Sequence, residues 1–148
     1  MRFEQLPHLS QIKTLERLHK YINQNLFENK LSKIDMDIVN IHTKDAFGMF
    51  STNDIVGNRI AISYEMIDVL SQLKYQKEQA LCLGAVILHE MIHQYCYENN
   101  IDDSNHGGMW YETAKEHGLI SIYENGELVR EELTISDDFA LSLFTIRK

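Results

Sequence analysis

Amphipathic patterns in the first half of the chain predict two helices that pack against a core. After Ser10, a candidate N-cap, apolar residues recur at three- and four-residue spacing as far as Leu26, which is the spacing of one helix face. After Ser63, a second candidate N-cap, the same spacing continues to Leu73 and predicts a shorter helix. Polar residues fill the other positions, so we expect each helix to bury one side only.

The longest apolar stretch of the chain runs from Gln76 to Asn100. Its apolar residues surround the predicted helix on nearly all sides, so we expect this helix to be the buried axis of the domain. A further helix is predicted from Met109 to His117. Gly118 follows it at the position where many helices end on a residue with left-handed backbone.

Three shorter segments have the pattern of β-strands. Residues 34–42 begin with apolar and acidic residues in alternation, and residues 47–52 and 59–63 are the other two strand candidates. We expect the three to form a small antiparallel sheet. Farther along, Asn125-Gly126 separates two strand-like runs within residues 120–130, which is a strong signal for a hairpin.

These elements predict a single α+β domain over residues 1–148. A chain of 148 residues with 44% hydrophobic residues suffices for one core and not for two. We place the core at about residues 10–118 and assign residues 119–148 to a C-terminal hairpin and tail. Residues 137–148 of that tail fit either a strand or a short helix.

The charge of the chain limits its partners. A net charge of −8, with the 14 lysines and arginines scattered, argues against a general affinity for nucleic-acid backbones. No stretch approaches the roughly 18 apolar residues of a membrane span, and the first residues lack the apolar core of a signal peptide. Cys82 and Cys96 would lie about 21 Å apart on one helix, too far for a disulfide. We therefore expect a soluble cytoplasmic protein without a membrane partner.

The long helix carries the pattern H-E-x-x-H as His89, Glu90 and His93. Four residues make about one helical turn, so both histidines can direct a ring nitrogen at the same ion. Glu90 lies roughly 60° around the helix from them, where its carboxylate can reach a water on the metal instead of the metal itself. Zinc lowers the pKa of such a water to around 7, and a carboxylate base can then take its proton.

A catalytic zinc needs a third protein ligand and one open position. The best candidate is His106, because the preceding segment is long enough and has suitable turn residues to bring it back over the helix. Glu112 or Glu116 on the next predicted helix are alternatives, and Cys96 is a remote one. Asn99 stands where the metzincin pattern requires histidine, which excludes that subclass.

The segment from Leu88 to Tyr97, followed by His106-Gly107-x-x-Trp110, resembles the SprT-like zinc metallopeptidase family, to which Spartan belongs. Its pattern is HExxH, a variable loop, and HGxxF, so Trp110 replaces the usual phenylalanine. The resemblance covers about residues 10–118. It implies a zincin-like fold with His89, His93 and His106 on one zinc ion per chain and Glu90 as the catalytic acid/base. Many members continue into a cysteine-rich zinc ribbon or a DNA-binding extension, and neither pattern occurs within these 148 residues.

The resulting hypothesis is a zinc metallopeptidase that cleaves protein or peptide substrates. The family resemblance extends the substrates to DNA-associated proteins, although the charge gives DNA binding no support. Two other interpretations remain: a zinc-stabilised, non-catalytic module that binds protein or DNA, and a domain without metal whose histidines form ordinary hydrogen bonds. Oxyanion stabilisation would fall to a tyrosine near the motif. The candidates are Tyr64, Tyr95, Tyr97 and Tyr111.

Overall fold

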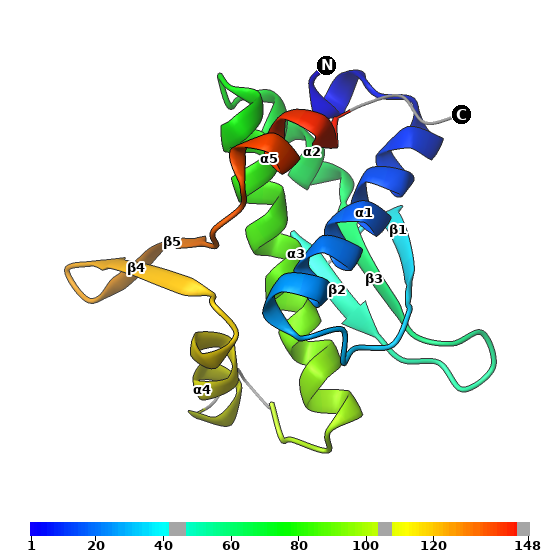
Figure 1. The fold of residues 1–148 in the computed structure, drawn as a ribbon, viewed down its shortest axis with the longest axis vertical. Helices are drawn as coiled ribbons and strands as arrows, with labels where there is room; N and C mark the ends of the chain where they lie inside the picture. The colour runs from blue at the N-terminus through cyan, green and yellow to red at the C-terminus, as the bar shows by residue number, and fades with distance from the viewer. Residues whose placement is uncertain (42–46, 104–107, 145–148) are drawn as a thin grey trace.

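The computed structural model describes residues 1–41, 47–103 and 108–144, and it contains helices and short strands (Figure 1). In chain order they are the 3-10 turn η1 (Phe3–Gln5), α1 (His8–Leu26), β1 (Asp35–Val39), β2 (Gly48–Ser51), β3 (Arg59–Ser63), α2 (Tyr64–Ser71), α3 (Gln76–Glu98), α4 (Gly108–Glu116), β4 (Ile120–Glu124), β5 (Glu127–Glu132) and α5 (Asp137–Leu143). The protein is therefore mixed α+β, as the hydrophobic pattern predicts.

Helix α3 runs through the centre of the molecule and contacts helices α1, α2, α4 and α5 as well as strands β2, β3 and β5 (Figure 1). Its fully buried apolar side chains include Leu83, Ile87, Leu88, Met91 and Ile92. Complete burial of one such side chain favours folding by about 1.5–3 kcal/mol. The expectation that this stretch is the buried axis of the domain is confirmed.

The sheet of β1, β2 and β3 is mixed. The prediction of an antiparallel sheet is therefore correct for one of its two strand pairings and wrong for the other. Strand β3 lies between the other two; β2 is antiparallel to β3, whereas β1 is parallel to it. The antiparallel pair is joined by a short connection, which is a local arrangement. The parallel pair joins strands that are not neighbours in sequence, and strand patterns do not reveal such a pairing.

The first helix begins earlier than expected. Pro7, not Ser10, is the N-cap: its backbone is extended, with φ −56° and ψ 152°, and its carbonyl accepts the N–H of Gln11 at 2.9 Å. Ser10 lies inside the first turn, where it is buried and its carbonyl accepts a hydrogen bond from the Thr14 hydroxyl. Serine is a common N-cap, but here the extended backbone of Pro7 starts the helix three residues earlier.

Other local signals are confirmed. The Ser63 hydroxyl oxygen accepts the N–H of Met66 at 3.1 Å and caps α2. Asn125 and Gly126 both have positive φ and join β4 to β5 in the predicted hairpin. Gly118 has φ +89° after α4. The tail, which the sequence left undecided, forms helix α5 over residues 137–143. Among the described residues, no helix combines the length and the apolar character that crossing a bilayer requires.

A buried polar network ties α1 to α3. The His19 ring donates from Nε2 to the side-chain oxygen of Gln94 at 2.9 Å, and His19 is only 6% exposed. The Gln94 amide donates in turn to the Ser32 carbonyl and to the Glu98 carboxylate. Burial lowers the pKa of His19 below its usual value, and the bonded Gln94 and the charge of Glu98 offset this only in part.

Because the pKa of His19 is lowered in the folded protein, we expect the free energy of unfolding to fall in mild acid. The unfolded chain takes up the proton near pH 6.5 whereas the folded protein does so only at lower pH, so protonation favours unfolding between these values. The contribution is at most about 1.4 kcal/mol per pH unit. We expect His19→Gln to lose less unfolding free energy than the wild type between about pH 7.5 and about pH 5.5, measured by urea denaturation.

His8→Gln provides the control, because His8 is an exposed histidine on the same helix. This variant removes a histidine but leaves the buried hydrogen bond between His19 and Gln94 in place. Identical pH slopes for His19→Gln and wild type would contradict the prediction.

Candidate active site

One turn in the C-terminal half of α3 holds the H-E-x-x-H residues. The rings of His89 and His93 lie with their centroids 5.4 Å apart in an edge-to-face arrangement. Both rings are partly exposed, whereas Glu90 is buried at 7% exposure. The helix therefore brings together the three motif residues as their spacing predicts.

Each imidazole is hydrogen-bonded through Nδ1 to a carboxylate from outside the helix. Nδ1 of His89 lies 3.1 Å and 3.3 Å from the two carboxylate oxygens of Glu131, on β5. Nδ1 of His93 lies 2.6 Å from Oδ2 of Asp103, in the segment that follows α3. A carboxylate accepts the Nδ1–H bond, so the neutral form of each ring has its lone pair on Nε2, the atom through which it could coordinate a metal. Carboxylates bonded in this way are the usual outer partners of metal-binding histidines.

The charges around the two rings act differently on them. Burial lowers the pKa of His89, but the hydrogen bond to Glu131 and the charges of Glu90 and Glu131 outweigh it, and the pKa is raised overall. For His93, burial and the nearby His89 prevail over Asp103, and the pKa is lowered. Two adjacent imidazoles thus do not favour being charged together, which suits a site that binds a cation.

Trp110 forms one wall of the site. It lies on α4 and is buried, with its ring centroid 4.7 Å from that of His89 and 5.5 Å from that of His93. The contact fixes α4 against the motif turn of α3. The tryptophan in the His106-Gly-x-x-Trp segment therefore packs directly on the two histidines.

Strand β2 holds the carboxylate of Glu90. The backbone N–H of Phe50 bonds to it, while burial raises the pKa of Glu90 to about 7 against the opposing effects of His89 and Phe50. Gly48 lets the strand come this close to the helix. A Cβ atom at Gly48 would lie 2.9 Å from Cγ1 of Val86 and 3.2 Å from Oε2 of Glu90.

A cavity of about 830 Å³ opens beside Glu90 and His93. Strand β2 contributes Met49 and Phe50 to its wall, and the end of α3 contributes Tyr97, whose ring centroid lies 5.8 Å from that of Phe50. The other lining residues are Cys96, Glu98, Asn100, Ile101 and Asp103. The cavity has room for a substrate side chain next to the motif.

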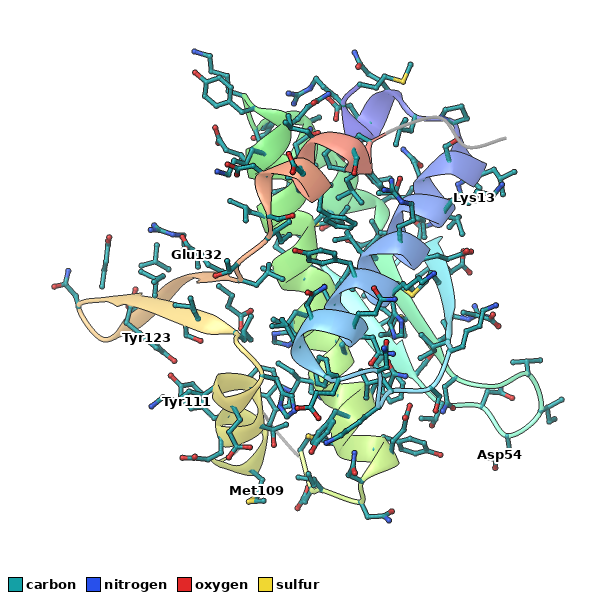
Figure 2. The ribbon with its side chains drawn as sticks, viewed as in Figure 1. Lys13, Asp54, Met109, Tyr111, Tyr123 and Glu132 are labelled. Carbon is teal, nitrogen blue, oxygen red and sulfur yellow. The ribbon has the colours of Figure 1, made fainter. Side chains whose placement is uncertain are left out.

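Of the four tyrosines considered for oxyanion binding, only Tyr97 lines this cavity. Tyr95 packs against Phe27 and His117, and Tyr64 begins α2. The hydroxyl of Tyr123 on β4 donates to that of Tyr111 on α4 at 3.1 Å, so the two side chains connect the hairpin to α4 (Figure 2).

The third ligand expected from the sequence, His106, lies outside the described residues. Within the described ranges, no group of three His, Cys, Asp or Glu side chains is placed to hold a metal ion. Glu112 and Glu116, the alternatives, are exposed on α4. Burial raises the pKa of the Cys96 thiol, which disfavours the thiolate that a metal requires.

Sequence patterns missed the partners of the motif. Asp103 follows His93 by ten residues in an acidic turn, and an acid close after the helix is a weak signal that could have suggested it. Glu131 is 42 residues from His89 and carries no local signal. The Phe50 N–H and the closeness of Gly48 belong to the backbone, which residue patterns do not display.

Two imidazoles with carboxylates on their outer nitrogens, beside a third, buried carboxylate, resemble part of the arrangement found in metal-dependent hydrolases. The chain matches the model of a protein family described as metallopeptidase toxin 3 over residues 4–132, and it belongs to that family. The match supports a metallopeptidase in general, and it does not support the more specific assignment to the SprT-like family. A comparison with curated proteins finds no match.

The close approach of Gly48 to α3 predicts that a single added methyl group is costly. We expect Gly48→Ala to lower the free energy of unfolding by about 1–3 kcal/mol, because the new Cβ overlaps Val86 and crowds Glu90. Guanidinium denaturation of the wild type, Gly48→Ala, Val86→Ala and the double variant measures the coupling. Val86→Ala removes the overlapping Cγ1. The double variant should therefore lose less unfolding free energy than the sum of the losses in the two single variants. Additive losses would contradict the proposed overlap.

Proposed function

We propose that this protein is a zinc-dependent peptidase that hydrolyses peptide bonds in protein substrates, with His89, His93 and His106 as metal ligands and Glu90 as the general base. The observation that carries the proposal is the pairing of His89 with Glu131 and of His93 with Asp103. These bonds leave Nε2 of both rings as the coordinating atom. When bound, zinc would supply a Lewis acid that polarises the scissile carbonyl and lowers the pKa of the attacking water.

Glu90 has the position of a proton carrier in this proposal. Its carboxylate comes from the same helical turn as the two histidines, and a backbone hydrogen bond from Phe50 favours its ionised form. It would take the proton of the attacking water and deliver it to the leaving amine. Glu90 also lines the cavity, so a water or substrate held there would lie next to its carboxylate.

The edge of β2 offers a place for an extended substrate. Ser63 donates its N–H to the Phe47 carbonyl, so these two residues form a hydrogen-bonded pair of the ladder. By the alternation of an antiparallel strand, the peptide groups of Gly48 and Phe50 face away from β3. A peptide lying along this edge would pass Glu90, and one of its side chains would enter the cavity lined by Met49, Phe50 and Tyr97.

Chain connectivity supports His106 as the third ligand. His106 is three residues from Asp103, and three residues span at most about 11 Å. Asp103 is itself bonded to His93, and Trp110, four residues beyond His106, contacts both rings. The resemblance of the His106-Gly-x-x-Trp110 segment to the SprT-like pattern supports the same assignment.

The family description includes the word toxin, which supports a peptidase whose cleavage of proteins harms a cell. The SprT-like resemblance would extend the substrates to DNA-associated proteins. The net charge of −8 lends no support to contact with DNA, so we propose protein as the substrate without a nucleic-acid partner.

The role of Glu90 predicts that Glu90→Gln abolishes hydrolysis and retains zinc. We expect the rate of cleavage of a quenched fluorescent peptide library to fall by about 10²-fold or more, since general base catalysis contributes about that much. Elemental analysis of the chelator-washed protein should still find about one zinc per chain, as for the wild type. Full activity of Glu90→Gln would rule out its catalytic role. Zinc without activity in the wild type, together with unfolding of His93→Ala, would indicate a structural zinc module instead.

The ligand assignment predicts that His106→Ala loses zinc whereas Glu112→Ala and Glu116→Ala keep it. Both glutamates are exposed on α4, so their variants are matched controls for the same part of the chain. Zinc content after dialysis against a chelator measures the difference. Zinc retained in His106→Ala and lost in a glutamate variant would move the third ligand to that glutamate.

A further inference from the structure

The hairpin of β4 and β5 projects from the body of the molecule (Figure 1). Most of its residues are exposed, and only Glu131 and Glu132, at the end of β5, are half-buried within that strand. Glu132 lies at the base of the hairpin, near α3 (Figure 2). The hairpin thus meets the axis of the domain through its last residues.

The segment directly after the hairpin is fixed against α3 at Gly84. Leu133 and Ile135 are buried there, and a Cβ atom at Gly84 would lie 2.9 Å from Cδ1 of Ile135 and 3.1 Å from Cδ2 of Leu133. The absence of a side chain at Gly84 lets this segment lie in close contact with the helix. One residue farther on, the Ser136 N–H donates to the Tyr21 hydroxyl on α1 at 3.1 Å.

This anchoring determines where the Glu131 side chain lies. Glu131 is two residues before Leu133, and His89 is five residues, or about one and a half turns, beyond Gly84. Both carboxylate oxygens of Glu131 come within 3.3 Å of Nδ1 of His89. Among the described residues, Glu131 forms no ion pair with a lysine or arginine that would hold it elsewhere.

We propose that Glu131 is a positioning residue of the metal site and that the C-terminal hairpin is thereby part of that site. The proposal rests on the proposed zinc function. By accepting the Nδ1–H bond, Glu131 holds the His89 ring in one orientation and in the tautomer that coordinates through Nε2. Because coupling between two sites is reciprocal, metal on His89 also stabilises the docked hairpin.

The decisive experiment compares zinc affinity in Glu131→Gln and Glu127→Gln, both made in the full chain. Glu127 begins the same strand and is exposed, so its variant removes the same charge from the hairpin without touching His89. Competition with a chelator of known affinity should give a Kd about 10–100-fold weaker for Glu131→Gln, the usual effect of losing such a partner. Glu127→Gln should bind zinc as the wild type does.

A second measurement on the wild type does not depend on a variant that folds. The ¹⁵N shifts of the His89 imidazole in the zinc-loaded protein should show a protonated Nδ1 and a metal-bound Nε2. A metal-bound Nδ1 would overturn the proposal, and so would an unchanged Kd in a folded Glu131→Gln. Absence of zinc binding by the wild type would overturn both the role of Glu131 and the proposed function. Zinc binding by the wild type with either of the two results above would overturn the role of Glu131 alone.

Discussion

The structure depends on the accommodation of one polar turn in an apolar helix. His89, Glu90 and His93 lie on α3 among the fully buried Leu88, Met91 and Ile92. A buried polar group without a hydrogen bond costs about 1–3 kcal/mol, and a charged one more. Each motif residue therefore needs a partner, and the partners come from strand β2, the segment after α3, and strand β5. The elements packed around the C-terminal half of α3 are placed so that they meet this need.

The edge position of β2 in the sheet serves the same requirement. With β3 in the middle, β2 is an edge strand whose outer peptide groups are not used within the sheet. One of them, the Phe50 N–H, bonds to Glu90 instead. Gly48 allows the strand and the helix to approach closely enough for this bond. A single strand thus both orients the proposed base and presents an edge on which an extended peptide can lie.

Sequence patterns predicted the features that depend on neighbouring residues. The H-E-x-x-H motif, the Ser63 cap and the Asn125-Gly126 turn each involve residues within a few positions of one another. The parallel pairing of β1 with β3 was not predicted because its strands are separated by another strand. Glu131 could not be found because it is one of 22 acidic residues and only the packing of Leu133 and Ile135 at Gly84 brings it to His89. The start of the first helix at Pro7 was not predicted because Ser10 carries the more common N-cap signal.

The balance of charge explains why this turn fits a divalent cation. Three carboxylates, those of Glu90, Asp103 and Glu131, lie around two imidazoles, and within the described residues none of the three pairs with a lysine or arginine. The negative charges of Glu90 and Glu131 contribute to the raised pKa of His89, so positive charge is favoured at this position. A cation held by Nε2 of both rings would complete a carboxylate–imidazole–metal arrangement on each side. Because the partners belong to different segments of the chain, metal binding and the packing of those segments on α3 would favour one another, so the free energy of binding also stabilises the fold.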